Sequence, residues 1–364
     1  MRIAVLLDQW HADGGGLEQY LHSVLPELVS RGHSLLLAAR GASNGTPQGV
    51  TAVDLRRGRL LPRPWSDRQE AREAVQVADH WNADRIWGLR AIPCEGSLWQ
   101  PMGGSSPDVQ KARARVPSRR TRSLMRLEEE TLQAAACVLP MSPMVKREIE
   151  KRAPGKQQIM LPLPLLELPS GMQVPAKRDP VSKQSPLRIL HCGRDPLRHG
   201  AKEAVEWFRC LRPRGIYARL DLWAKTITHA EHAIGAPAGS LLEEGVVLHP
   251  WNGGFRQALQ SADLLFHPTL YDSFSLVCLE AAAAGVPVVT TQAAGVAELL
   301  PSAMCATEPR ELPEVAAARG MELFLEACAY PEDAWLRLGE EVRTGFQLQN
   351  HVAQIELALE KSPR

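Results

Sequence analysis

The feature that most constrains the fold is an order of elements that occurs twice: a short apolar strand, a glycine-containing loop and an amphipathic helix. Residues 2–32 have this order (RIAVLLD, QWHADGGG, then LEQYLHSVLPELVSRG), and residues 187–212 repeat it (LRILHC, GRDPLRHG, AKEAVEWFRCLR). Further short apolar stretches are expected to be strands: 33–40, 218–224, 245–250, 262–268 and 286–291. Apolar strands that alternate with helices predict parallel sheets covered by helices on both faces.

A proline-rich stretch separates the two halves. Its prolines stand at positions 162, 164, 169, 175, 180 and 186. Such a stretch cannot form a helix or a central strand. We therefore predict an α/β protein with an N-terminal domain over 1–165, a linker over 166–186 and a second domain over 187–345. Both domains are expected to be Rossmann-like, with parallel sheets facing across a cleft, and ligands belong in that cleft at the carboxyl ends of the strands.

Composition excludes several classes of protein. The 364 residues are 45% apolar and 23% charged, and the formal net charge of +1 gives no general attraction to nucleic acid. The seven cysteines form no C-x-x-C pair, which favours a reducing cytosol. The apolar part of the opening MRIAVLLDQW is too short for a secretory signal, and no apolar run approaches the roughly 18 residues that a membrane span needs.

The best candidate for a binding site is a carboxylate in an otherwise apolar helix. Positions 276–284 are all apolar except Glu280. A glutamate on a solvated helix face is the alternative, but no other polar residue marks such a face. A buried carboxylate needs hydrogen-bond donors, and the vicinal diol of a ribose would supply them. Eight residues earlier stands Asp272, and the serines after it can cap the helix and leave backbone N–H groups near 274–276 free for an anion.

The segment HPTLYDSFSLVCLEAAAAGVPVVTT (267–291) resembles the donor-site signature of family 4 retaining glycosyltransferases, which have the GT-B fold. In that signature two acidic residues enclose seven others, as Asp272 and Glu280 do here, and an Ala-x-Gly-x-Pro turn follows (AAGVP). Supporting matches are GGGLEQYLHSVLPELVSRGH, GRDPLRHG and SADLLF. The resemblance covers 1–40 and 187–300 and is strongest to lipopolysaccharide-core-type hexosyltransferases. It implies that the last segment, 346–364, is a helix that returns to the N-terminal domain.

The resemblance also implies roles for the residues of the signature. Glu280 would hold the donor ribose, and Asp272 would hold hydroxyls of the transferred sugar. The backbone amides at Phe274, Ser275 and Leu276 would meet the diphosphate.

Two further segments receive roles from the resemblance. Gly15 and Gly16 would let the N-terminal backbone approach the donor. The segment GRDPLRHG, which begins with Gly193, would supply through Arg198 a cationic clamp for the departing diphosphate. Its second cation would be His199, which is only partly charged at neutral pH, or Lys202 one turn into the helix.

The chain departs from the family pattern at several positions. His199 stands where a lysine is usual, Asp272 replaces the commoner glutamate, Ser275 replaces the commoner glycine, and Met102 stands where relatives are expected to have histidine. These departures keep open a second interpretation, in which the chain is a catalytically impaired nucleotide-sugar-binding or scaffold protein. A third, a sugar-nucleotide epimerase of the same fold, would need carboxylates near the sugar C2, and no candidates for them are evident.

A basic stretch and a histidine pair give weaker signals. Residues 111–126 contain seven basic side chains, which fits either a solvated surface or arm, or a site for an anionic lipid surface or a phosphorylated acceptor. His229 and His232 are spaced as a helical pair but have no third metal ligand, and no Asp-x-Asp sequence occurs.

Taken together, the sequence predicts a metal-independent retaining glycosyltransferase. It would transfer a hexose from a nucleoside-diphosphate sugar, a UDP-sugar above all, to a glycan or glycolipid acceptor in cell-envelope polysaccharide or lipopolysaccharide synthesis. No cofactor is expected, because the nucleotide sugar is itself the donor substrate, and nucleic acid is not an expected partner. The expected location is the cytoplasm, with residues 111–126 as the candidate contact to the inner face of the cytoplasmic membrane.

Overall fold

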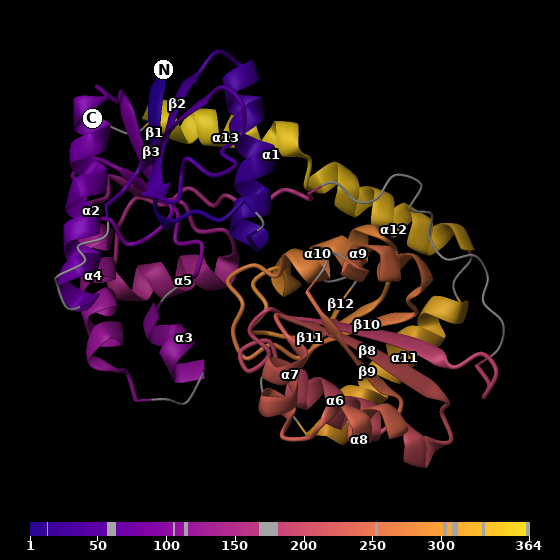
Figure 1. The fold of residues 1–364 in the computed structure, drawn as a ribbon. Coiled ribbons are helices and arrows are strands. Elements are labelled where there is room, and N and C mark those ends of the chain that lie inside the picture. Colours follow the sequence, from indigo (N-terminus) through magenta and orange to yellow (C-terminus); the bar gives the residue numbers. More distant parts are fainter. Residues whose placement is uncertain are drawn as a thin grey trace. The chain divides into compact units, whose positions relative to one another are not determined.

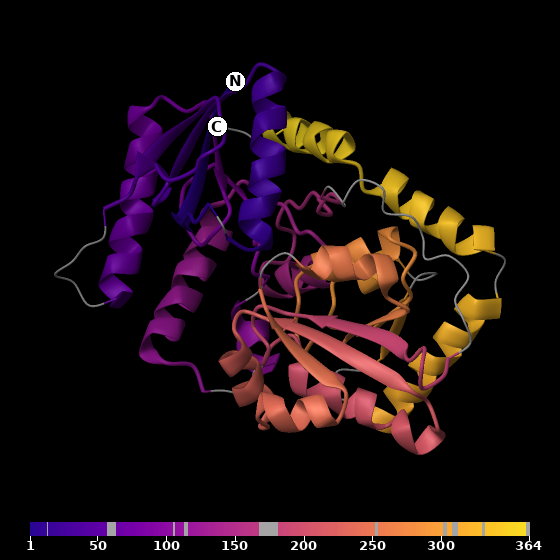
Figure 2. The ribbon, with the colours of Figure 1, turned by 45° about the vertical axis from the view of Figure 1, so that its right-hand side comes forward.

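The computed structural model describes residues 1–12, 14–56, 63–104, 106–112, 116–166, 181–251, 254–300, 304–307, 312–329 and 332–361. The chain divides into two compact units (Figures 1 and 2). The first unit comprises Met1–Leu166 with Phe346–Arg364, and the second comprises Glu167–Gly345. Most of the predicted linker, residues 167–180, lies outside the described residues.

The first unit is built on a six-stranded parallel sheet of order β3-β2-β1-β4-β5-β6. Its strands are β1 (Arg2–Gln9), β2 (Ser34–Arg40), β3 (Val50–Asp54), β4 (Arg85–Gly88), β5 (Leu98–Trp99) and β6 (Cys137–Val138). Its helices are α1 (Gly16–Ser30), α2 (Arg63–His80), α3 (Ser106–Ala112), α4 (Arg119–Ala134), α5 (Pro143–Arg152) and α13 (Leu348–Lys361). Alternate residues of β1 serve the two faces: Ala4 and Leu6 pack in one cluster with Ala74 of α2, while Val5 is buried on the opposite face.

The C-terminal helix α13 packs on α1 in this first unit, where Figure 1 draws it in yellow beside the indigo α1. His351 joins the two helices through the Tyr20 hydroxyl, 2.8 Å from its Nε2, and its Nδ1 lies 2.7 Å from the Pro162 carbonyl oxygen. Since a carbonyl can only accept, Nδ1 donates to it and Nε2 accepts from the tyrosine. Glu356 binds Arg31 at 2.9 Å and adds an ion pair near the end of α1.

The second unit is built on another six-stranded parallel sheet, of order β12-β11-β10-β7-β8-β9. Its strands are β7 (Leu187–Cys192), β8 (Ala218–Ala224), β9 (Val246–Pro250), β10 (Leu264–His267), β11 (Val288–Thr291) and β12 (Met304–Thr307). Its α-helices are α6 (Ala201–Arg209), α7 (Ile227–Ile234), α8 (Ala238–Glu243), α9 (Gly254–Ala258), α10 (Leu276–Ala283), α11 (Pro313–Ala329) and α12 (Glu332–Gly345). Short 3-10 helices are η1 (Arg212–Arg214), η2 (Leu259–Ser261) and η3 (Ala297–Leu299).

Helices cover both faces of this sheet. On one face Val205 and Phe208 of α6 pack with Phe266 of β10 in a buried cluster that includes residues of α7 and α11. On the other face α10 contacts β10 and β11 and packs against α12. The prediction of two parallel α/β sheets is thereby confirmed, because apolar strands buried on both faces leave few other arrangements. Among the described helices, no stretch is long and apolar enough to cross a bilayer.

Candidate functional site

The predicted donor residues of the second unit gather in two loops that follow neighbouring parallel strands, β7 and β10. The loops are hydrogen-bonded to each other: the backbone oxygen of Arg198 accepts from the Leu270 amide at 2.9 Å and from the Thr269 hydroxyl at 3.1 Å. Gly200 makes this approach feasible, because it adopts a φ of +78° and any Cβ there would overlap the Pro268 carbonyl. The two segments that the sequence singled out therefore form one surface at the carboxyl ends of these strands.

Asp272 lies in the second loop and turns back onto its own backbone. Its Oδ1 accepts hydrogen bonds from the amides of Phe274 at 3.3 Å and Ser275 at 3.1 Å. Burial raises the pKa of Asp272, but the neighbouring His267 and the positive charge of Arg198 outweigh burial, so that the pKa lies well below its usual range. This carboxylate is ionised at any physiological pH.

The expectation that Ser275 caps the helix and leaves the amides of residues 274 and 275 free is wrong. Ser275 is the N-cap residue of α10 but makes no side-chain cap; its hydroxyl donates to the Cys278 sulfur at 3.2 Å. The amides of Phe274 and Ser275 are held by the Asp272 carboxylate, because an aspartate side chain is short enough to reach amides two and three residues on. Ser275 also has a φ of +73°, a conformation that favours glycine and accounts for the glycine expected in relatives.

Glu280 is 4% exposed on α10 and has a partner that sequence reasoning missed. Arg256 of α9 donates to the same oxygen, Oε1, from Nη2 at 2.6 Å and from Nε at 3.1 Å. Burial raises the pKa of Glu280, and Arg256 offsets part of the rise. The buried carboxylate is thus stabilised within the protein, and no sequence pattern links the two residues that form the pair.

The predicted cationic clamp is only partly present. Arg198 donates to the Tyr271 carbonyl at 3.2 Å and holds the second loop. Burial, followed by the charge of Arg198, lowers the pKa of His199 well below its usual value, so the expected partial charge on this imidazole at neutral pH is wrong. Lys202 is a solvent-exposed residue of α6 whose Nζ lies 3.7 Å from Glu206. Of the three expected cations, only Arg198 is both charged and hydrogen-bonded to the loop that contains Asp272.

A cluster of histidines, which the sequence analysis did not anticipate, fills the space beneath these loops. His191 of β7 and His267 of β10 stack with ring centroids 5.8 Å apart, and the His199 ring meets the edge of His267 at 5.5 Å. Gly193 makes room for this packing, since any Cβ there would overlap the His199 side chain. The sequence offered one signal for this cluster: His191 is the last residue but one of β7, and His267 is the last residue of β10.

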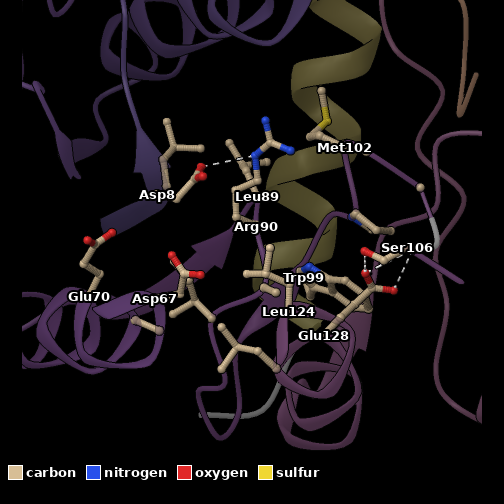
Figure 3. A pocket seen from close by; sticks show the side chains of 18 of the residues that line it. Asp8, Asp67, Glu70, Leu89, Arg90, Trp99, Met102, Ser106, Leu124 and Glu128 are labelled. Carbon is tan, nitrogen blue, oxygen red and sulfur yellow. Dashed lines mark hydrogen bonds and ion pairs between the residues drawn. The ribbon is translucent and has the colours of Figure 1, made fainter. Parts of the chain in front are cut away.

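The first unit contains a pocket of about 190 Å³ at the carboxyl ends of β1, β4 and β5 (Figure 3). Its lining combines ion pairs with apolar surface: Asp8 meets Arg90 at 3.3 Å, and Asp67 meets Arg120 at 3.1 Å, beside Leu124. Figure 3 also shows Glu128 beneath Ser106, whose amide donates to it at 3.1 Å.

Other predicted residues of the first unit lie in or near this pocket. Met102 lines it, whereas Gly15 and Gly16 form the start of α1 with Gly15 as N-cap. Within the basic stretch 111–126, Arg120 is engaged by Asp67, and Arg122 donates to the Pro117 carbonyl at 2.7 Å. The part of the stretch from 116 onwards is therefore built into the fold instead of forming a free arm, while 113–115 lie outside the described residues.

Comparison with known proteins places these features in a family. The profile described as "Family 4 Glycosyltransferase in conflict systems" matches residues 106–336, more than half of the chain. No curated protein matches the chain in sequence.

Solved structures match the fold over nearly the whole chain. WaaG, a glycosyltransferase involved in lipopolysaccharide biosynthesis, has a TM-score of 0.75 at 16% identity, covering 99% of this chain and 100% of WaaG. Sucrose-phosphate synthase from Thermosynechococcus elongatus has a TM-score of 0.73 at 16% identity, with 99% and 98% covered. HepE from Anabaena, solved with UDP and glucose, has a TM-score of 0.70 at 15% identity, with 99% and 100% covered.

Proposed function

We propose a reaction for this chain, which belongs to the family 4 glycosyltransferases in conflict systems. It transfers a hexose from a UDP-sugar to a glycan or glycolipid acceptor, with retention at the anomeric carbon. The observation that carries the proposal is the joined pair of loops after β7 and β10, where Arg198 binds the carbonyl of Tyr271, the residue before the ionised Asp272. A guanidinium tied to a loop can stabilise the growing charge of a leaving diphosphate, and an ionised carboxylate can accept hydrogen bonds from sugar hydroxyls.

The start of α10 has a smaller part in this proposal than the sequence alone suggested. With the amides of Phe274 and Ser275 engaged by Asp272, the amide of Leu276 is the remaining candidate of the three for the diphosphate. Glu280 keeps its proposed contact with the ribose through Oε2, since Arg256 donates from Nε and Nη2 to Oε1. The transfer itself is proposed to need no metal, because Arg198 supplies the cation.

The pocket of the first unit is proposed to hold the acceptor. Its ion-paired polar rim and its apolar floor suit a sugar, which offers hydroxyls at its edge and C–H groups on its faces. The proposed setting is cell-envelope polysaccharide or lipopolysaccharide synthesis, as for WaaG, with the basic stretch 111–126 as the contact to an anionic membrane surface.

Radiolabelled UDP-sugars and other nucleotide sugars, offered with and without glycan acceptors, test the proposal. We expect transfer or slow hydrolysis from one donor in the presence of a chelator, and an anomeric configuration in the product that matches the donor. Inversion at the anomeric carbon, or a requirement for added metal, would contradict the corresponding part of the proposal.

A second candidate is a nucleotide-sugar-binding protein without transfer activity. The observation that favours it is the uncharged His199 at the position where the family has a second cation. Nucleotide binding without transfer from any donor in the panel would select this alternative.

A further inference from the structure

The second unit contains a set of metal-binding side chains for which the transfer reaction has no use. His199, His267 and Asp272 each offer a ligand atom, and these atoms all lie within 4.8 Å of one another. His267 Nε2 lies 3.8 Å from Asp272 Oδ2. The three residues come from the loop after β7, the end of β10 and the loop after β10, so the packing of two neighbouring strands brings them together.

The ring nitrogens of this cluster lack hydrogen-bond partners within the described part of the chain. Both nitrogens of His199 and both of His267 are buried and make no hydrogen bond there, and His267 as a whole is 0% exposed. A buried polar group without a partner is costly, and native proteins leave very few of them. One nitrogen of each ring lies close to the Asp272 carboxylate, which indicates that the site takes up a metal ion or a water molecule.

We propose that His199, His267 and Asp272 bind a Zn²⁺ ion. Two imidazoles and a carboxylate are ligands that zinc accepts, whereas Mg²⁺ and Ca²⁺ prefer oxygen ligands. In a tetrahedral zinc site with bonds of about 2.1 Å, neighbouring ligand atoms lie about 3.4 Å apart. The observed 3.8 Å between His267 Nε2 and Asp272 Oδ2 approaches this separation, and all three ligand atoms would move closer together from within 4.8 Å on binding the ion.

The surroundings hold two of the three ligands in place. The Asp272 carboxylate is fixed through Oδ1 by the amides of Phe274 and Ser275, and it therefore presents Oδ2 to His267. The His267 ring is stacked on His191, whose Nδ1 lies 2.8 Å from the Phe266 carbonyl oxygen. The carboxylate is thus held by hydrogen bonds, and the His267 ring is held by packing.

Three protein ligands leave a fourth position for water or another ligand. If the proposed function holds, the ion also competes with the donor, because an Asp272 carboxylate that binds zinc is not free to bind sugar hydroxyls. Zinc would then inhibit an enzyme that needs no metal for transfer.

Calorimetric titration of the chelator-treated full chain with Zn²⁺, without nucleotide, tests the proposal. We expect one ion per chain, and Co²⁺ in its place should give the visible absorption of tetrahedral cobalt. His199→Gln and Asp272→Asn should each weaken zinc binding at least about tenfold. The matched control is the double variant His229→Gln/His232→Gln, which removes two exposed histidines of α7 and should bind zinc as the unaltered chain does.

No stoichiometric binding to the unaltered chain would overturn the proposal and leave water as the partner of the ring nitrogens. Equal binding by the Asp272→Asn variant, or equal loss in the control, would overturn it as well. If His199→Gln fails to fold, Asp272→Asn and the Co²⁺ spectrum still decide. Since binding is measured without nucleotide, an inactive protein that binds zinc would contradict the proposed function alone, and an active one that does not would contradict the ion site alone.

Discussion

The ion pair between Arg256 and Glu280 allows the structural and ligand-binding roles of the buried carboxylate to be separated. Arg256→Met removes both hydrogen bonds to Oε1 and leaves a carboxylate whose side chain is 6% exposed. Such a group can escape its buried charge by taking up a proton. From an ordinary pKa of 4.5, protonation at pH 7 costs 2.5 units, or about 3.4 kcal/mol. This cost is the upper limit of the destabilisation. We expect the free energy of unfolding of Arg256→Met to fall by about 2–3 kcal/mol, since Arg256 itself is partly solvated.

The loss should depend on pH in a defined direction. Without Arg256 the folded-state pKa of Glu280 rises further above its unfolded value, because burial is no longer offset. The folded variant then binds more protons than the unfolded chain, so its stability falls as pH rises from about 4.5 to 7. The Glu280→Gln variant has no ionisable group at this position. The double variant Arg256→Met/Glu280→Gln should therefore recover part of the stability that Arg256→Met alone loses. The coupling energy in this cycle is expected to be about 1.5–3 kcal/mol.

Urea unfolding at pH 5 and pH 7, followed by circular dichroism, measures the four corners of the cycle. Effects that add within about 0.5 kcal/mol, or an Arg256→Met loss that is equal at both pH values, would refute the reasoning. Calorimetric titration of the same proteins with UDP then tests the ribose contact. A direct contact predicts that Glu280→Gln weakens UDP binding by about 1–3 kcal/mol and Arg256→Met by less, whereas equal losses indicate a structural role alone.

Three further predictions rest on single residues. Ser275→Gly should raise the thermal midpoint by relieving the positive φ, worth about 0.5–1 kcal/mol after the entropy of glycine is subtracted, and Ser275→Val should lower it. Burial lowers the pKa of His351 to about 4 from 6.5, so the unfolded chain takes up the proton first. The chain should therefore lose about 3 kcal/mol as pH falls from about 6.5 to 4, and His351→Gln should flatten this part of the profile. Arg198→Ala should lower turnover about 100- to 1,000-fold with a much smaller effect on donor binding, because the charge it meets grows in the transition state; equal losses in KM and kcat would contradict this.

The sheets could be predicted because their signal is local. Strands buried on both faces are short apolar runs, so the predicted 218–224 coincides with β8, and the predicted 2–8 differs from β1 by one residue. The predicted end of α6 is too late, because Arg212 begins the separate 3-10 helix η1, of which Pro213 is the second residue. The site was found at the level of segments for the same reason, because the acidic pair and the preceding loop are contiguous in the sequence.

What the sequence did not show were contacts between segments. Arg256 is one arginine among many until the packing of α9 beside α10 aims it at Glu280. The histidine cluster depends on the register of β7 against β10, which pairs Ile189 with Leu264 and so brings the ends of both strands together. The occupied amides after Asp272 depend on how its carboxylate is oriented in the folded loop. These three features determine the chemistry of the site, whereas the sheet only positions the loops that form it.

The departures from the family pattern acquire a common explanation once the loops are folded together. Read along the chain, the histidine at 199, the aspartate at 272 and the serine at 275 are separate and mild exchanges. In space, His199 and Asp272 belong to the cluster that we propose binds zinc, and Ser275 donates its amide to the Asp272 carboxylate. A longer glutamate could not make the same close turn, and a lysine at 199 would place a charge where a neutral ring now packs against His267. The three exchanges therefore lie together in the folded loops, where a change at one of them alters the contacts of the others.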